Sequence, residues 1–334
     1  MKPITIKDVA RLAQVSISSV SRYLTDPTSI RPAAAISVNK AIMELNYIPN
    51  PFAQNLKSES TNIIAVILPD ISDHFFSEAC KAICNLFYMY NYTVMICDTN
   101  GEPEKERHYV DDMARNRCAG IMLVPCGKNT EYLKEVLSRF PRLMLFDRLE
   151  PGIPADMVSE DNLRSGYILT RHMLNQGHRR FVVLNGLENS VNMHYRLNGV
   201  RKALMEAGLT LEDEYSLVNL RSKVDAAQAL ERLVKKPGCP RCILACNTHL
   251  LEGIVIAASR MKLSVPDEYS LAGFSVDDPR HLFPFPVPAV VQNPAALGTQ
   301  AGEVMLKRLR GNIKNSAPKI VMLDTKLDFA GSDR

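Results

Sequence analysis

The chain has 334 residues, of which 46% are hydrophobic and 23% are charged, and its formal net charge is +4. This is the composition of a soluble globular protein with about two or three domains, and it excludes a membrane-spanning protein. The N-terminus lacks the apolar core of a signal peptide, so we expect a cytoplasmic protein with no membrane partner.

The positive charge is concentrated near the N-terminus. The first 60 residues carry seven lysines and arginines against four acidic residues, so +3 of the total charge of +4 lies in this segment. Such an asymmetry is compatible with a face that binds nucleic acid, but an excess of three charges is too small to establish one.

The N-terminal segment is predicted to begin with two short helices. Thr5 and Asp8 resemble a capping box at the start of the first helix. An apolar stripe follows, made of Val9, Ala10, Leu12 and Ala13. After a break at Gln14, Ser16 is a good N-cap for a second helix that continues to Leu24. Two helices joined by about three residues form a helix-turn-helix.

A third helix is predicted from Pro32, because proline suits the first turn of a helix. The apolar side chains expected to close the small core of this segment are Ile36, Val38, Ala41, Ile42 and Leu45.

From Ile63 onward, apolar runs of strand length alternate with amphipathic helices such as Ser77 to Tyr90. The runs are residues 63–68, 93–97, 120–124, 143–146, 181–184, 243–246 and 270–274. Buried strands that alternate with helices predict an α/β fold with parallel sheets covered by helices on both faces. In such sheets the carboxyl ends of the strands border the ligand site, so two facing sheets would share a cleft.

Eight cysteines are spread along the chain, and several lie in apolar patterns where reduced thiols are expected, so we predict no disulfides. Cys239, Cys242 and Cys246 have a spacing that metal sites use, with His249 as a distant fourth ligand. The competing interpretation, a buried strand that contains Cys242 and Cys246, is favoured. We therefore predict no metal and no cofactor.

Several motifs occur in order along nearly the whole chain. In the N-terminal segment they are Thr5-Ile-Lys-Asp-Val-Ala-Arg-Leu-Ala13, Val15-Ser16 with Val20-Ser21-Arg22, and Leu45-Asn-Tyr-Ile-Pro-Asn50. In the remainder they are Pro69-Asp-Ile-Ser72 with Phe75-Phe76, Asp161-Asn162, Gly177-His-Arg-Arg180, Arg196-Leu-Asn-Gly199 and Gly273-Phe274. With these motifs the chain resembles the lactose/galactose repressor family of bacterial transcription regulators.

The resemblance implies an N-terminal all-α helix-turn-helix headpiece and a hinge helix, followed by a periplasmic-binding-protein-like type I core of two doubly wound parallel-sheet subdomains. The implied boundaries are 1–48 for the headpiece, 49–60 for the hinge, 61–160 with 292–322 for the core N-subdomain, and 161–291 with 323–334 for the core C-subdomain. It also implies a homodimeric repressor of carbohydrate-metabolism genes that binds double-stranded DNA at a palindromic operator.

By resemblance, the second helix lies in the major groove of DNA, with Ile17, Ser18 and Arg22 reaching the base edges. Arg22 can bind guanine through two hydrogen bonds, and the alternative is that it contacts only phosphate. The residues expected to contact the DNA backbone are Thr5, Ser16, Ser19 and Ser21.

The segment from Pro49 to Lys57 is too short to be a stable helix alone, since helix nucleation is costly. The resemblance implies that it folds against DNA and a partner hinge, with Leu56 as an apolar wedge in the minor groove at the operator centre. The residues expected to line the minor groove or backbone beside this wedge are Asn50, Ala53, Gln54, Asn55 and Lys57.

In the core, the resemblance implies an effector pocket in the cleft for a small sugar or sugar acid. The residues that it assigns to this pocket are Phe75, Phe76, Asp147, Asp161, Arg196, Asn247 and Ser275. Apolar walls with a few converging polar groups suit a small polyol or acid, and the Arg196 guanidinium can bind hydroxyls or a carboxylate. The alternative for Arg196 is an arginine on a helix surface.

The chain departs from the family pattern at four places, one of which is Ala34-Ala35, where the family often has Thr-Arg and where an expected phosphate contact is lost. Ser275-Val276 follows Gly273-Phe274 where the family commonly has two aspartates, and Asn247-Thr248 stands where Asn-Asp is common. Losing an acid that would accept from sugar hydroxyls favours an acidic or phosphorylated sugar over a neutral hexose. In the headpiece, Gln14 replaces the glycine that is usual in the turn.

Two other functions agree less well with the sequence. A solute receptor would need an export signal, and an enzyme would need a motif such as GxSxG, HExxH, Walker A or GxGxxG, none of which occurs. Within a regulator, two mechanisms remain open. An inducer can misplace the hinges, or a corepressor, either a small molecule or a phosphorylated carrier protein, can favour the DNA-bound form.

Overall fold

The computed structural model describes residues 4–47, 61–188, 190–276, 282–311 and 317–329. The chain divides into two units, Met1–Thr61 and Asn62–Arg334, which are described separately. None of the helices in the described ranges is long and apolar enough to cross a lipid bilayer.

The helices of the N-terminal unit are α1 (Ile6–Leu12), α2 (Ile17–Thr25) and α3 (Pro32–Glu44), with the 3-10 turn η1 (Pro27–Ser29) between α2 and α3. Both predicted helix starts are confirmed. The Asp8 carboxylate accepts hydrogen bonds from the Thr5 N–H at 3.0 Å and from the Thr5 hydroxyl at 2.7 Å. Ser16 Oγ accepts from the Ser19 N–H at 3.1 Å, which satisfies one of the free N–H groups at the start of α2.

The turn between α1 and α2 forms without a glycine. Gln14 adopts a φ of 55°, in the left-handed region that glycine enters at little cost. For a residue with a Cβ this conformation costs about 1–2 kcal/mol. The departure from the family pattern at Gln14 therefore leaves the backbone of the helix-turn-helix intact.

The core of the N-terminal unit contains Val9, Val20, Val38 and Ala41, all without exposed surface. The prediction for Ile36 is wrong, because its side chain is 71% exposed. Ile36 precedes Val38 by two residues, which turns it about 200° around the helix axis and away from the core.

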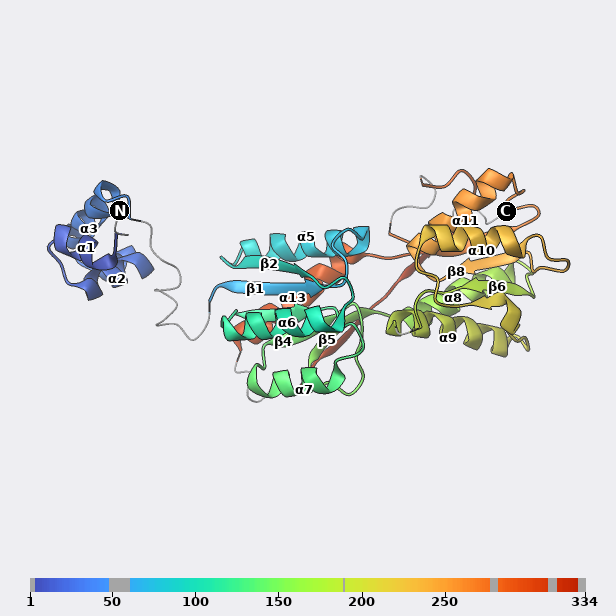
Figure 1. Ribbon diagram of the computed structural model, residues 1–334, viewed down its shortest axis with the longest axis horizontal. Helices are drawn as coiled ribbons and strands as arrows, with labels where there is room; N and C mark the ends of the chain where they lie inside the picture. Colours follow the sequence, from blue (N-terminus) through green and yellow to red (C-terminus); the bar gives the residue numbers. More distant parts are fainter. Residues whose placement is uncertain (1–3, 48–60, 189, 277–281, 312–316, 330–334) are drawn as a thin grey trace. The chain divides into compact units, whose positions relative to one another are not determined.

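The first sheet of the second unit has the strand order β11-β5-β4-β3-β1-β2, and all its neighbouring strands pair in parallel (Figure 1). Its strands are β1 (Ile63–Leu68), β2 (Thr93–Asp98), β3 (Gly120–Leu123), β4 (Leu143–Phe146), β5 (Asp156–Glu160) and β11 (Ile320–Leu323).

Helices cover both faces of this sheet because its central strands carry apolar side chains on each face. Ile64 and Val66 of β1 pack with α5 (His74–Tyr88) and α13 (Pro294–Arg310). Ala65 and Ile67 pack on the other face with α6 (Pro103–Arg115) and α7 (Thr130–Arg139). The predicted doubly wound arrangement is therefore present in the first sheet.

The second sheet has the strand order β12-β10-β9-β8-β6-β7. Its strands are β6 (Phe181–Leu184), β7 (Ser216–Leu217), β8 (Cys242–Ala245), β9 (Ser270–Ser275), β10 (Ala289–Val291) and β12 (Lys326–Asp328). The prediction of parallel strands fails at one edge, where β12 is antiparallel to β10. The chain passes almost directly from β11 in the first sheet to β12 in the second. The strand β12 therefore starts beside the end of β10 and runs in the opposite direction.

The second sheet is covered by α8 (Asn162–Asn175) and α9 (Val191–Glu206) on one face, and by α10 (Lys223–Leu233) and α11 (Thr248–Met261) on the other. A 3-10 turn, η2 (Asp213–Tyr215), precedes β7. Two glycines allow α8 and α9 to pack backbone to backbone. A Cβ on Gly199 would lie 2.1 Å from the Leu163 carbonyl oxygen, and a Cβ on Gly166 would lie 2.1 Å from the Arg196 carbonyl oxygen.

Replacing Gly199 with alanine should lower the free energy of unfolding by about 1–3 kcal/mol, because the added methyl group forces α8 and α9 apart. Urea denaturation measures this difference. Met205→Ala on the exposed face of α9 is the matched control and should stay within about 0.5 kcal/mol of the wild type. Equal stability of the two variants would contradict the close packing of the two helices.

Candidate ligand-binding and nucleic-acid-binding sites

The predicted major-groove residues lie together on the outer face of α2. Ile17, Ser18 and Arg22 are exposed, whereas Val20 of the same helix is fully buried. Arg22 Nε donates to the Ser18 carbonyl oxygen at 3.4 Å, so the arginine lies along its own helix next to Ser18. An apolar, a hydroxyl and a guanidinium group are thus presented side by side, which suits base edges in a groove.

The residues predicted for backbone contacts lie at helix starts and along α2. Thr5 and Ser16 are exposed caps, and Ser19 and Ser21 are half-buried. The Ser16 hydroxyl lies 2.8 Å from that of Ser18 and 2.9 Å from that of Ser19. The predicted hinge residues, Asn50, Ala53, Gln54, Asn55, Leu56 and Lys57, lie outside the described part of the chain.

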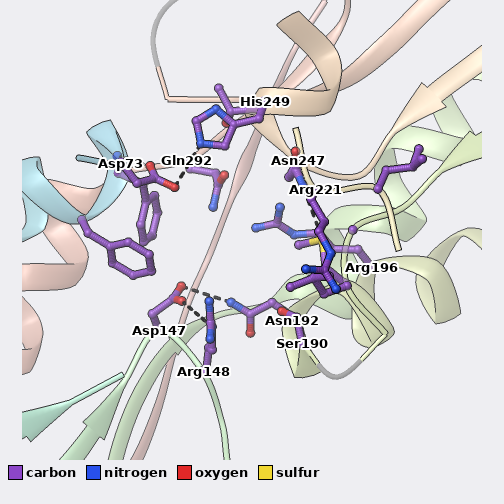
Figure 2. Close-up of a pocket in the computed structure, with 17 residues that line it drawn as sticks. Asp73, Asp147, Arg148, Ser190, Asn192, Arg196, Arg221, Asn247, His249 and Gln292 are labelled. Carbon is purple, nitrogen blue, oxygen red and sulfur yellow. Dashed lines mark hydrogen bonds and ion pairs between the residues drawn. The ribbon is translucent and has the colours of Figure 1, made fainter. Parts of the chain in front are cut away.

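A cavity of about 270 Å³ lies at the carboxyl ends of the strands, between the two sheets of the second unit (Figure 2). The first sheet contributes the start of α5 and the loop after β4, and the second sheet contributes the start of α9, the loop before α10 and the start of α11. Five of the seven predicted pocket residues line this cavity, and they are Phe75, Phe76, Asp147, Arg196 and Asn247.

Two predicted pocket residues, Asp161 and Ser275, do not line this cavity. The Asp161 carboxylate is the N-cap of α8, where it accepts from the Arg164 N–H at 2.9 Å. The next residue, Asn162, turns inward instead and contacts Arg196. Ser275 is fully buried at the end of β9, and its carbonyl oxygen accepts from the Gln292 N–H at 2.8 Å.

Arg196 is held rigidly in the cavity wall, and its side chain is only 3% exposed. Nε donates to Asn162 Oδ1 at 2.7 Å and Nη1 donates to the Cys246 carbonyl oxygen at 2.7 Å. The guanidinium carbon lies 4.0 Å from the centre of the Phe274 ring, within reach of a cation–π interaction. The alternative of a surface arginine is therefore wrong, because α9 directs Arg196 inward.

Asp147 is the buried carboxylate of the cavity and connects the two halves of the wall. Its Oδ1 accepts from Asn192 Nδ2 at 3.1 Å, and its Oδ2 lies 3.9 Å from Arg148 Nε. Burial raises the pKa of Asp147 to about 6, Arg148 acts against this rise, and Glu160 adds to it. The residue also adopts a φ of 64°, which aspartate and asparagine tolerate better than most residues.

The raised pKa of Asp147 predicts a pH-dependent effect of the Asp147→Asn substitution. Below the unfolded pKa the carboxyl group of Asp147 is protonated in both states and does not reduce the free energy of unfolding. As the pH rises through about 6 the buried group must ionise, and the wild-type protein loses stability. The amide that replaces the carboxyl group does not ionise, so the free energy of unfolding of the variant relative to wild type should rise by about 2 kcal/mol between about pH 4 and pH 8. Urea denaturation at both pH values checks this.

The Asp213→Asn change is the control for this measurement, because Asp213 is exposed in the 3-10 turn η2 and does not line the cavity. Its difference from wild type should not change between the two pH values. A difference for Asp147→Asn that is equally flat would contradict the unfavourable burial of the carboxylate.

A second contact joins the two halves of the cavity wall at Asp73 and His249 (Figure 2). Asp73 Oδ1 caps α5 by accepting from the Phe75 N–H at 2.9 Å, and Oδ2 lies 3.3 Å from His249 Nε2. Hydrogen bonds to Asp73 and Glu252 raise the pKa of His249 to about 9, so the imidazole is protonated at neutral pH.

Sequence reasoning missed several polar residues of the cavity wall, among them Arg148, Asn192, Arg221 and His249. Each of these lies just beyond a strand or within the first residues around a helix start. A position just after a parallel strand could have indicated two of these residues, since Arg148 follows β4 and His249 follows β8. Asn192 and Arg221 belong to longer connections, for which this signal is weaker.

The cysteine cluster does not converge on one point. Cys239 packs in the core on one face of the second sheet, and Cys242 and Cys246 pack in the core on the other face. Burial raises the pKa of Cys246 to about 12 and that of Cys242 well above its usual value, so both are neutral thiols. The interpretation of Cys242 and Cys246 as part of a buried strand segment agrees with this placement.

The comparisons with known proteins cover both units. Residues 5–50 match the family described as "Bacterial regulatory proteins, lacI family", and residues 170–329 match the "Periplasmic binding protein-like domain". The "HTH-type transcriptional repressor PurR" of Vibrio campbellii is 30% identical over 329 residues, which cover 96% of this chain and 98% of that protein.

Solved structures share the fold over almost the whole chain. The Lac repressor bound to ONPG in the repressed state is 21% identical, covers 98% of each chain and has a TM-score of 0.83. The transcriptional regulator CelR in complex with cellobiose is 19% identical, covers 98% of this chain and 100% of that chain, and has a TM-score of 0.72. Because the PurR repressor of Vibrio campbellii is 30% identical over nearly the whole of both chains, the chain belongs to the lacI family of bacterial regulatory proteins and is a DNA-binding transcriptional regulator, not an enzyme.

Proposed function

We propose that the protein is a cytoplasmic, homodimeric repressor of carbohydrate-metabolism genes whose affinity for a palindromic operator changes when a small sugar or sugar acid binds in the cavity. The cavity between the two sheets carries this proposal. Apolar rings and a few fixed polar groups converge there on a space of about 270 Å³, just below the range of about 300–1,000 Å³ that is usual for ligand pockets. The similar regulator CelR was solved with cellobiose, a sugar.

The cavity also offers a way to transmit ligand binding. Its walls come from two sheets that are joined across the cavity by the Asp73–His249 and Asp147–Asn192 contacts. A ligand that binds both walls stabilises one relative position of the two sheets over others. In a dimer this preference would be passed to the hinge and the headpiece.

For operator binding we propose that Ile17, Ser18 and Arg22 read base edges in the major groove, and that Leu56 of the hinge acts as the minor-groove wedge. The exposed face of α2 supports the first assignment. The assignment of the hinge rests on its sequence motif alone.

For the dimer we propose a surface on the first sheet and its neighbouring helix. Tyr88 and Met89 at the end of α5 are 82% and 68% exposed, and Met95 and Ile96 of the edge strand β2 are each 41% exposed. An edge strand with exposed apolar side chains is covered in most stable proteins. A second copy of the chain would cover the same surface symmetrically.

The test is selection of DNA from a random pool by the purified full-length protein, followed by sedimentation of the complex. We expect enrichment of a palindrome with a flexible central step and two chains per operator. Enrichment of a non-palindromic sequence or of none would overturn the proposal. Repeating the binding assay with sugars, sugar acids and their phosphates shows whether a small effector changes operator affinity.

A further inference from the structure

The charges in the cavity wall are unequally matched. His249 is matched by Asp73, and Arg148 lies 3.9 Å from Asp147. Arg196 and Arg221 also line the cavity, and within the described part of the chain neither has a carboxylate at ion-pair distance. The wall therefore presents two guanidinium groups that form no ion pair in the described ranges. Asp147 and Glu160 act on Arg196, and Asp225 acts on Arg221, only at longer range, so an anion bound beside either guanidinium would add a direct partner for its charge.

Arg221 is anchored by its backbone and leaves its guanidinium available. The Arg221 N–H donates to Asp225 Oδ2 at 2.8 Å, and the same carboxylate accepts from the Ser222 N–H at the capping box of α10. The side chain is exposed at the cavity. A guanidinium presents donors in a planar fork that matches a carboxylate or a phosphate, so the position is suited to an anionic group.

Asn192 presents a buried acceptor that needs a hydrogen-bond donor from the ligand. Its side chain is 6% exposed and lines the cavity, and Nδ2 donates to the Asp147 carboxylate. This contact orients the amide, and Oδ1 is buried with no hydrogen-bond partner in the described part of the chain. A buried acceptor without a partner is unfavourable, and a hydroxyl group of a ligand would satisfy it.

We infer that the effector is a hydroxylated anion, an acid or a phosphate ester with neighbouring hydroxyl groups, whose anionic group binds Arg221 and whose hydroxyl donates to Asn192 Oδ1. This inference rests on the proposed function of the cavity as the effector site. Figure 2 shows the arrangement, with Asp147 and Arg148 on one wall and Asn192, Arg196 and Arg221 on the other. A neutral sugar would leave the unmatched guanidinium groups without an anion.

The test uses the purified full-length protein and measures its thermal midpoint and calorimetric affinity with D-gluconate, D-glucuronate, D-glucose 6-phosphate, D-glucose and adipate. We expect at least one hydroxylated anion to raise the thermal midpoint at about 10 mM, with glucose and the hydroxyl-free adipate at least about tenfold weaker. The two sugar acids and the sugar phosphate distinguish a carboxylate from a phosphate. No response to any hydroxylated anion, or an equal response to glucose, would overturn the inference.

Two variants assign the effect to Arg221. Arg221→Gln should weaken binding of the anion about tenfold to a hundredfold, and Arg221→Lys should restore part of the affinity, because it keeps the charge but not the fork. Arg232→Gln is the matched control, an exposed arginine on α10 that does not line the cavity, and its affinity should match wild type. Wild-type affinity of Arg221→Gln would contradict the assignment.

Operator binding is measured on the same samples without ligand and with each ligand added, so that an inducer and a corepressor are both detected. If the protein binds its operator but no hydroxylated anion, the inference fails and the proposed DNA-binding function stands. If it binds hydroxylated anions but no palindromic operator, the proposed function fails while the ligand class stands.

Discussion

An Arg196→Met protein should unfold more easily than wild type and should lose its response to the effector. Methionine fills a similar volume but leaves Asn162 Oδ1 and the Cys246 carbonyl oxygen without their buried donors. Two unsatisfied acceptors correspond to a loss of about 3 kcal/mol in the free energy of unfolding. Urea denaturation without ligand measures this loss directly.

The same variant should bind the effector at least about a hundredfold more weakly, since the Arg196 guanidinium also supplies charged donors to the cavity. The control is Arg201→Met, which changes an exposed arginine on the same helix and should leave both measurements near wild type. Wild-type stability of Arg196→Met would show that its two hydrogen bonds contribute little. Wild-type effector affinity of Arg196→Met would show that the effector does not bind beside Arg196.

An Arg22→Ala protein should lose operator affinity by about 1–3 kcal/mol per half-site while keeping its folded stability. The stability should hold because Arg22 is exposed and, among the described residues, its side chain makes a single long hydrogen bond of 3.4 Å, to its own helix. Fluorescence anisotropy with the selected operator and with single-base variants measures the change.

The pattern of the loss distinguishes the two interpretations of Arg22. A base contact predicts relaxed preference at one base pair of each half-site, whereas a phosphate contact predicts uniform weakening and a smaller dependence on salt. Lys40→Ala on α3 is the control for the removal of one exposed positive charge. Equal losses for the two variants would remove any special role of Arg22.

One strand that was not predicted from the sequence, β5, carries charges whose partners lie far along the chain. The strand β5 is fully buried but begins with Asp156 and ends with Glu160, so its sequence resembles a loop. Arg308 Nη2 donates to Asp156 at 2.7 Å, and Gln292 Nε2 donates to Glu160 at 2.7 Å. Local apolar patterns cannot reveal such pairs, because each partner comes from another element more than a hundred residues away.

The helix-turn-helix and its exposed face could be read from the sequence because local chemistry determines them. The Asp8 and Ser16 caps satisfy N–H groups within their own helices, and the spacing of Val20 from Arg22 decides which side of α2 faces outward. The long apolar strands of the core could be read for the same reason, since apolar runs of that length must be buried.

The ligand site was only partly determined in this way. Arg196 and Asp147 were predicted from the family resemblance, but the sequence did not reveal that Asp161 caps α8 while Asn162 turns inward to hold Arg196. The unpaired acceptor of Asn192 exists only because α9 packs its amide against Asp147 of the other sheet.

By itself the sequence determined the helix-turn-helix and the alternating strands and helices, because these follow from spacing and capping within short segments. The class of regulator was indicated by the resemblance of its motifs to a known family. Only the tertiary structure decided which charges remain unbalanced in the cavity. Two sheets must meet before Arg221 and Asn192 share a wall with Asp147, and the balance of charge and hydrogen bonds there depends on distances between residues far apart in the chain.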